Sequence, residues 1–216
     1  MTAPSPRLIL ASTSPRRREL LAHLGVPYTS TSSDFDEDAI PFDHDDPGGW
    51  TVALARGKAR AVAANTKGAA LVIGADTTVV LDGNMFGKPA DADDAARMLR
   101  ALSGRTHQVY TGVVVVPVAD NRIGPVDTAY DVTHVTFKEL SDDFIAEYVA
   151  TGEPLDKAGA YGIQNHGLAL IDDIRGDYYN VVGFPLHLVR ELLLLHLPVV
   201  GDAPANPNLP FPVRER

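Results

Sequence analysis

The stretch ALVIGADTTVVL, residues 70–81, constrains the fold of this chain more than any other. It is the most hydrophobic run and predicts a buried β-strand, and the Asp82-Gly83 pair behind it predicts a hairpin turn. Asp76, Thr77 and Thr78 interrupt the run with polar side chains. A buried carboxylate without a partner costs several kcal/mol. Asp76 therefore needs a metal ion, a cation or a water at a strand end facing a cleft, unless the strand ends one residue early in an Asp-Thr turn.

The rest of the chain alternates between patterns typical of strands and patterns typical of helices. Strands are expected at residues 7–11, 27–33, 106–118, 128–137 and 168–174, and helices at 15–25, 51–65, 92–102, 141–150 and 186–197. The acidic stretch 34–49 is expected to be a loop. The two long strands, 106–118 and 128–137, are expected to pair antiparallel. We therefore predict an α/β fold in which helices flank a mixed sheet.

Length, charge and cysteine content exclude several classes of protein. The 216 residues suffice for one sizeable domain or two small lobes around a cleft, since domains usually have about 100 to 200 residues. The net charge of -9 argues against a large nucleic-acid or anionic-membrane surface. The absence of cysteine excludes disulfides, thiolate metal sites and a cysteine nucleophile. No apolar run is long enough for a signal peptide or a transmembrane helix, so we expect a cytoplasmic protein.

A basic cluster follows the first expected strand. Ser14, Pro15 and the three arginines at 16–18 predict a helix with Ser14 as its N-cap and Pro15 as its first residue. The arginines then lie in the first turn, where the helix macrodipole disfavours cations and favours anions. Exposed N–H groups and arginine side chains together make a site that phosphates commonly occupy. From these residues alone, an anion site and a solvated basic helix end both remain open.

Three further charged residues are candidates for a cleft. Glu37, in an acidic run, offers carboxylate oxygens that suit a hard cation such as Mg²⁺ beside Asp76, or it is solvated in a loop. Lys88 lies between a glycine and a proline, at a turn from which its ammonium group can reach a phosphate, although this tripeptide is weak evidence. Lys58 lies on an alanine-rich helix, where a lysine more commonly belongs to a solvated face.

The segment DKAGAYGIQ, residues 156–164, is rich in small residues that let the backbone approach a ligand closely. Tyr161 is expected to pack, and the Gln164 amide can hydrogen-bond the edge of a base. A tight turn with a packing tyrosine explains the same residues equally well. The seven histidines show no metal-ligand spacing, and His107 and His134 are expected to be structural.

Taken together, eight segments resemble the Maf family of nucleoside triphosphate pyrophosphatases; in chain order they are ASTSPRRRELL, DFDE, GKARA, GADT, GKP, LSGRTHQVYTGV, DKAGAYGIQ and GDYYNVVGFP. The resemblance extends from about residue 8 to residue 195. It implies an elongated α/β fold similar to that of inosine triphosphate pyrophosphatases, with a mixed twisted sheet, two lobes around a central cleft, and homodimers. Residues 1–197 are accordingly expected to form a single catalytic domain, followed by a proline-rich tail at 198–216.

The same resemblance implies roles for nine polar residues: for catalysis Asp76, Glu37 and Lys88, for substrate binding Ser12, Arg16 and Lys58, and for base preference Arg17, Thr77 and Gln164. Glu37 and Asp76 are also expected to hold the divalent metal cofactor, Mg²⁺ or Mn²⁺. The Arg, Thr and Gln combination resembles the branch that hydrolyses dTTP and UTP. Another branch, with different residues there, prefers 7-methyl-GTP.

These expectations combine into one reaction. Asp76 deprotonates a water that attacks the α-phosphorus of a nucleoside triphosphate, and Arg16, Lys58 and Lys88 neutralise the triphosphate charge. Pyrophosphate leaves and the monophosphate remains. We expect a homodimer with no nucleic-acid or membrane partner. A nucleotide-sensing regulator of cell division or septum formation, a pyrophosphatase of other base specificity, and a protein-binding module remain alternatives; the last does not explain charged residues within apolar strands.

Overall fold

The long axis of the molecule is formed by three long strands of one mixed sheet. In the computed structural model, which describes residues 6–196, the strand order is β2-β1-β3-β5-β7-β8, with β4 on β3 and β6 on β5. The strands are β1 Arg7–Ala11, β2 Tyr28–Thr31, β3 Ala70–Leu81, β4 Asn84–Phe86, β5 Thr106–Ala119, β6 Arg122–Ile123, β7 Asp127–Phe137 and β8 Ile171–Arg175. β1 pairs parallel with β2 and β3, whereas the other pairs are antiparallel. The predicted α/β class with a mixed sheet is confirmed.

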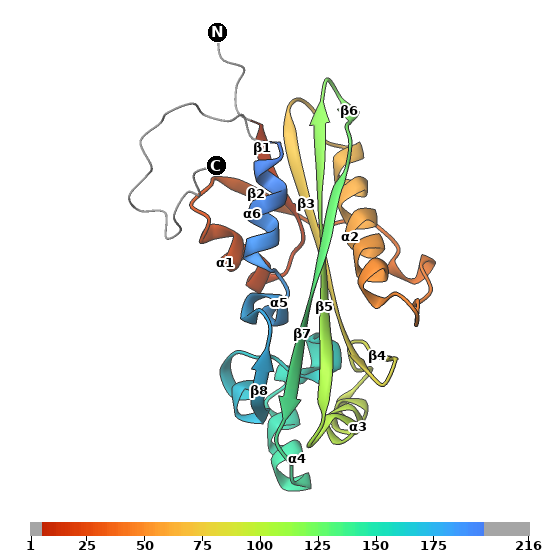
Figure 1. The fold of residues 1–216 in the computed structure, drawn as a ribbon, viewed down its shortest axis with the longest axis vertical. Coiled ribbons are helices and arrows are strands. Elements are labelled where there is room, and N and C mark those ends of the chain that lie inside the picture. Colours follow the sequence, from red (N-terminus) through yellow and green to blue (C-terminus); the bar gives the residue numbers. More distant parts are fainter. Residues whose placement is uncertain (1–5, 197–216) are drawn as a thin grey trace.

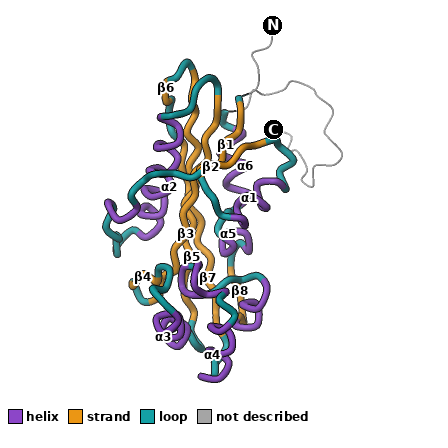
Figure 2. Tube along the Cα trace, turned by 180° about the vertical axis from the view of Figure 1, so that it is seen from behind, coloured by secondary structure: helices purple, strands orange, loops and turns teal. Residues whose placement is uncertain are grey.

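The helices divide the molecule into two lobes along that axis. They are α1 Pro15–Ala22, α2 Pro47–Ala64, α3 Ala92–Leu102, α4 Asp142–Ala150, α5 Tyr178–Val182 and α6 Leu186–Leu194, with 3-10 turns η1 Glu37–Ala39, η2 Glu153–Asp156, η3 Ala158–Ala160 and η4 Asn165–Leu170. Figure 1 shows α2 on one face of the upper half of the sheet and α1 and α6 on the other, while α3 and α4 lie at the lower end. The view from behind shows the same separation (Figure 2). β3, β5 and β7 run through both lobes.

Helix α2 packs unusually close to the sheet because two glycines make room for it. An alanine-rich face, with Ala55 and Ala59 fully buried, lies against β3 and β5. A Cβ atom on Gly74 of β3 would lie 2.2 Å from the carbonyl oxygen of Ala55, and one on Gly112 of β5 would lie 2.5 Å from the amide nitrogen of Val52. Side chains at both positions would push the helix away. The glycines therefore set the distance between α2 and the middle of β3.

Strand β3 has an open edge in its middle. It pairs with β5 over residues 70–80, but on its other edge β1 covers only 70–73 and β4 only 79–81. Residues 74–78 therefore have no strand neighbour on that side. Successive side chains of a strand point to opposite faces, so Asp76 and Thr77 flank this open edge from the two faces of the sheet. The gap between β1 and β4 leaves the backbone groups on this edge of residues 74–78 without a strand partner.

The structure confirms one local expectation and corrects three. The predicted strand at 70–81 forms without an early end at Asp76, which continues the strand opposite Gly112, because pairing with β5 holds the polar residues in register. The acidic stretch 34–49 is not all loop: it contains η1, and α2 begins at Pro47, where the Asp46 side chain accepts a hydrogen bond from the amide of Gly49. The expected strand at 168–174 begins only at Ile171, since 165–170 form a 3-10 turn, and the short helix α5 was not predicted.

Other expectations hold or remain predictions. α1 begins at Pro15 with Ser14 as N-cap, and β5 and β7 pair antiparallel, as predicted. α6 ends at Leu194 rather than at 197. The division into a domain at 1–197 and a proline-rich tail at 198–216 stays a prediction, because residues 197–216 lie outside the described part. Within that part, no helix is long and apolar enough to cross a bilayer.

Candidate active site

A cleft of about 870 Å³ opens between the two lobes, beside the open edge of β3. Its upper wall is formed by the start of α1, by η1 and by α2, and its lower wall by the chain after β4 and by residues 153–165. All nine residues that the sequence singled out line this one cleft: Ser12, Arg16, Arg17, Glu37, Lys58, Asp76, Thr77, Lys88 and Gln164. They come from six separate segments of the chain, which the fold brings together.

At the centre of the cleft, the ammonium group of a lysine lies between two carboxylates. Asp76 is 7% exposed, and its Oδ1 lies 2.5 Å from Nζ of Lys58. The same Nζ lies 3.0 Å from Oε1 of Glu37, a more exposed side chain on η1. The alanine-rich helix alone favoured a solvated face for this lysine, whereas the resemblance implied a place in the site; the close approach of α2 directs the side chain inward. Lys58 therefore supplies the partner that a buried Asp76 requires.

The residues at this centre fit a divalent metal ion. Glu37 and Asp76 both reach the position of the Lys58 ammonium nitrogen, so their oxygens already converge on one cation. Carboxylate oxygens are the ligands that Mg²⁺ and Mn²⁺ prefer. Within the described residues, the one group of three side chains with metal-ligand geometry is Asp131, Asp177 and His187, which does not line the cleft.

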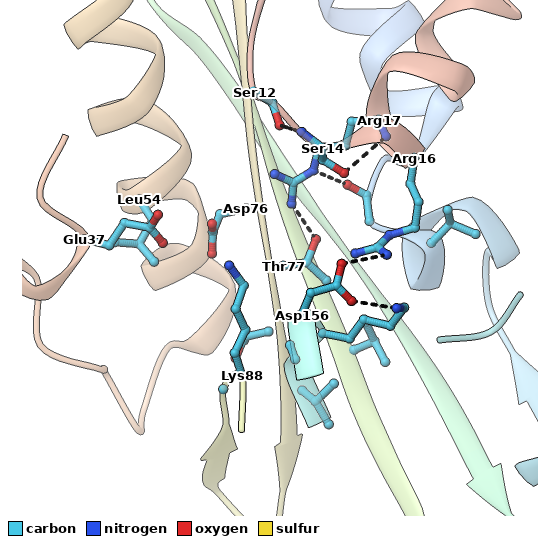
Figure 3. A pocket seen from close by; sticks show the side chains of 18 of the residues that line it. Ser12, Ser14, Arg16, Arg17, Glu37, Leu54, Asp76, Thr77, Lys88 and Asp156 are labelled. Carbon is cyan, nitrogen blue, oxygen red and sulfur yellow. Dashed lines mark hydrogen bonds and ion pairs between the residues drawn. The ribbon is translucent and has the colours of Figure 1, made fainter. Parts of the chain in front are cut away.

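The basic cluster on α1 lies at the upper rim of the cleft. Ser14 Oγ accepts a hydrogen bond from the amide of Arg17, and the amide of Ser14 donates to Oγ of Ser12 at 3.2 Å, which holds the helix start in place. Arg16 extends over the cleft, where its guanidinium lies 3.6 Å from the carboxylate of Asp156 in the lower lobe (Figure 3). The helix start and Arg16 thus present N–H groups to the same space.

Arg17 points into the molecule instead of toward solvent. It donates from Nε to the carbonyl of Gly183 at 2.9 Å, from Nη1 to the carbonyl of Ala75 at 2.8 Å and from Nη2 to Oγ1 of Thr77 at 3.1 Å (Figure 3). Burial lowers the pKa of this guanidinium, and the nearby negative charge of Asp76 partly opposes the shift. The bond to Ala75 covers one carbonyl of the open β3 edge. Arg17 therefore ties α1, β3 and the turn after α5 together.

The lower wall contains two charged residues that the sequence interpretation did not single out. Lys157 donates from Nζ to the carbonyl of Glu153 and to Oδ1 of Asp156, both at 2.6 Å. Burial alone would raise the pKa of the Asp156 carboxyl, but the hydrogen bond and charge of Lys157, with Arg16, bring it below its ordinary value. Both residues stand at the start of the small-residue segment, but neither has a local pattern that sets it apart from a surface ion pair.

Aromatic residues form the floor below that wall. Tyr161 lines the cleft and is 5% exposed, and its hydroxyl lies 2.7 Å from Nε2 of His107. Burial lowers the pKa of His107 to about 3, so the ring is neutral at neutral pH. Phe137 meets both rings edge to face. The packing role expected for Tyr161 and the structural role expected for His107 are confirmed.

The remaining predicted residues face the cleft from the lower lobe. Lys88 follows β4 and extends toward Asp76 (Figure 3), while Gln164 is half-buried at the start of η4. Within residues 6–196 the Gln164 side chain makes no hydrogen bond and Lys88 makes no ion pair. Both polar groups are thus available to a ligand. The cleft combines a buried acid, several cations and uncommitted hydrogen-bonding groups.

The mixed sheet and this charged cleft define the class of the protein, an α/β protein with a polar cleft between two lobes. The chain belongs to the family described as Maf-like protein, whose model matches residues 7–195. This match confirms the resemblance seen in the motifs.

Relatives match over almost their whole length. The dTTP/UTP pyrophosphatase of Moorella thermoacetica is 56% identical, over 88% of this chain and 94% of its own. The proteins of the same name from Symbiobacterium thermophilum and Deinococcus radiodurans are 50% and 49% identical, over 87% and 88% of this chain and 92% of each of theirs. A solved dITP/XTP pyrophosphatase from Mycobacterium abscessus aligns with 13% identity and a TM-score of 0.39, over 89% of this chain and 98% of its own.

Proposed function

We propose that this protein hydrolyses dTTP and UTP to the nucleoside monophosphate and pyrophosphate. One observation carries the proposal: a buried carboxylate, Asp76, lies at the open edge of β3 in a cleft that five cations also line, Arg16, Arg17, Lys58, Lys88 and Lys157. A triphosphate supplies the negative charge that such a cleft accommodates. The names of the relatives, dTTP/UTP pyrophosphatase, support the choice of substrate.

Asp76 is the general base in this proposal. Its Oδ1 is bonded to Lys58, and Oδ2 has no hydrogen-bond partner in the described chain, which leaves that oxygen to accept a proton from water. The water oxygen forms a bond to the α-phosphorus, and the bond from that phosphorus to the bridging oxygen breaks. Pyrophosphate leaves with the bonding electron pair. A positioned carboxylate base contributes about 10² to 10⁴-fold in rate.

The cations hold the triphosphate in line for this attack. Arg16 and the start of α1 approach from the upper rim, Lys88 from the lower lobe, and Lys58 lies beside the base. Fixed positive charge stabilises a leaving pyrophosphate in a site partly shielded from water. Mg²⁺ or Mn²⁺, held by Glu37 and Asp76, would add further stabilisation of the phosphate charge when bound.

Arg17, Thr77 and Gln164 are the residues that we assign to the base or sugar. Arg17 and Thr77 lie on the far side of the β3 edge from Asp76, and Gln164 faces them from the lower lobe. A site built to hydrogen-bond one base edge rejects bases that leave its polar groups unpaired. We further propose that the protein acts as a cytoplasmic homodimer, without a nucleic-acid or membrane partner.

A panel of nucleoside triphosphates tests the proposal. The purified protein is incubated with Mg²⁺ and each ribo- and deoxyribonucleoside triphosphate in turn, and the products are separated by anion exchange. We expect monophosphate and pyrophosphate in equal amounts, with dTTP and UTP cleaved fastest. Diphosphate with orthophosphate, or no cleavage of any triphosphate, would contradict the proposal.

A further inference from the structure

A chain of buried hydrogen bonds lies behind the Arg17 and Thr77 side chains. Thr77 Oγ1 lies 3.0 Å from Oγ1 of Thr111 on β5, and Thr111 Oγ1 donates to the backbone carbonyl of Asn180 on α5 at 2.9 Å. Thr111 and Asn180 are fully buried, and neither lines the cleft. These two residues therefore act on a ligand only through Thr77 and Arg17.

The hydroxyl protons in this series of hydrogen bonds can point in only one direction. A carbonyl oxygen accepts and never donates, so the single hydroxyl proton of Thr111 is used on Asn180. The bond between the two threonines then needs the proton of Thr77. Thr77 Oγ1 in turn accepts from Arg17 Nη2. Neither hydroxyl has a proton left for a ligand.

Arg17 is the donor that remains. A guanidinium carries five N–H groups, and three of those on Arg17 are bonded to Gly183, Ala75 and Thr77. Within the described residues, the other two have no protein partner. Arg17 therefore offers N–H groups of fixed direction to the cleft. Beside them lies the Thr77 hydroxyl, whose proton points away from the cleft.

We propose that Thr111 is a positioning residue for base selectivity, and that this wall of the cleft recognises a carbonyl oxygen of the base. This inference rests on the proposed function. Uracil and thymine carry an N–H at position 3 beside an oxygen at position 4, a donor next to an acceptor. Cytosine carries an unprotonated nitrogen and an amino group at these positions. An amino group facing the Arg17 donors would leave both sides unpaired, and buried unpaired donors are costly. Because Thr111 accepts the Thr77 proton, Thr77 can accept from the N–H of uracil but cannot donate to the unprotonated nitrogen of cytosine. Thr111 thus disfavours CTP without touching it.

The side chain of Asn180 has hydrogen-bond partners separate from the partner of its backbone carbonyl. The Asn180 side chain donates from Nδ2 to the carbonyl of Val109 at 2.9 Å and to Oγ1 of Thr133 at 3.0 Å. The Thr133 hydroxyl, on β7, also donates to the backbone carbonyl of Asp177 and accepts a hydrogen bond from the Asp177 amide. Thr133 is as buried as Thr111 but has no bond to Thr77 or Arg17. It provides a matched control for the loss of a buried hydroxyl.

The test compares Thr111→Val with Thr133→Val, which remove one buried hydroxyl each. The readout is the ratio of kcat/KM for UTP to that for CTP. We expect Thr111→Val to lower this ratio about tenfold, because the freed Thr77 hydroxyl can then turn its proton toward the unprotonated ring nitrogen of cytosine. Thr111→Ser, which keeps the hydroxyl, should restore the ratio, and Thr133→Val should leave it within about twofold of wild type. An unchanged ratio in Thr111→Val, or an equal loss in Thr133→Val, would overturn the proposal.

Two further measurements separate the possible failures. If Thr111→Val does not fold, Thr111→Cys, whose thiol is a weak hydrogen-bonding group, is expected to lower the ratio in the same direction; a wild-type ratio there counts against Thr111. If the wild-type protein cleaves no triphosphate, the proposed function fails. The ratio of the Kd values of UTP and CTP, measured by calorimetry in wild type and Thr111→Val, then still tests the positioning role: a tenfold change supports it and no change refutes it.

Discussion

The lysine at position 58 is the residue that makes a buried aspartate tolerable in the apolar strand β3. Its ammonium group bonds Asp76 and Glu37, and the side chains of Lys58 and Asp76 are 13% and 10% exposed. Removing one partner of such a pair leaves the other as an uncompensated charge. The pair is therefore stabilising as a unit even where neither residue is stabilising alone.

A double-mutant cycle measures this coupling. Lys58→Met is expected to lower the free energy of unfolding by about 1 to 3 kcal/mol, because Asp76 then lacks its partner. In the Asp76→Asn background the same change should cost much less, since no charge is left unpaired. Urea denaturation of the four proteins gives the coupling energy. Equal costs in both backgrounds would show that the pair contributes nothing.

The buried histidine at position 107 makes stability depend on pH. Its pKa falls from 6.5 to about 3 in the folded protein, so between these values the unfolded chain binds the proton and the folded chain does not. The contribution of neutral His107 to the free energy of unfolding is therefore fully present above pH 6.5 and is lost as the pH falls toward 3. Each pH unit in this window costs about 1.4 kcal/mol.

Comparison with His107→Gln isolates that effect from other titrating groups. Between pH 7 and pH 5 the wild-type protein should lose about 2 kcal/mol more unfolding free energy than the variant, because glutamine does not titrate. Chemical denaturation at several pH values gives both curves. Parallel curves over this range would mean that His107 binds its proton in the folded protein as readily as in the unfolded chain.

At the scale of elements, the approach of α2 to β3 places the lysine beside the acid. Gly74→Ala would bring a Cβ atom within 2.2 Å of the Ala55 carbonyl oxygen, so the helix must shift. We expect a loss of about 1 to 3 kcal/mol in unfolding free energy, as for other overpacked sites, together with a fall in kcat. Gly87→Ala is the stability control, since an added Cβ there meets nothing within 4 Å. Comparable losses in the two variants would contradict the steric account.

Local chemistry explains which elements could be predicted. The cap at Ser14, the first turn at Pro15 and the run at 70–81 are signals carried by neighbouring residues, and α1 and β3 follow them. The start of α2 at Pro47 was missed because it lies within an acidic stretch that resembles a loop. The pairing of β3 with β5, which carries the strand through Asp76, depends on residues more than thirty positions away. Such long-range pairing has no local signature.

At the scale of the whole molecule, the site arises because three long strands are shared by two lobes (Figure 1). The upper lobe places cations from α1 and α2 opposite cations from the lower wall of the cleft. Both sets surround the segment of β3 that lacks a strand partner on one edge. Motif resemblance predicted which nine residues meet there, whereas residue chemistry alone left each of them with a structural alternative. Asp156, Lys157, Thr111 and Asn180 gain their positions only from the tertiary fold.

In the proposed reaction, Asp76 acts as the base in hydrolysis at the α-phosphorus. Pyrophosphate release from UTP and dTTP by Asp76→Asn tests it most directly, with Asp82→Asn, an exposed acid just after β3, as the control. We predict that kcat of Asp76→Asn falls by about 10² to 10⁴-fold while KM changes by less than about threefold, and that Asp82→Asn keeps wild-type turnover. A folded Asp76→Asn enzyme with near-wild-type kcat would contradict the account.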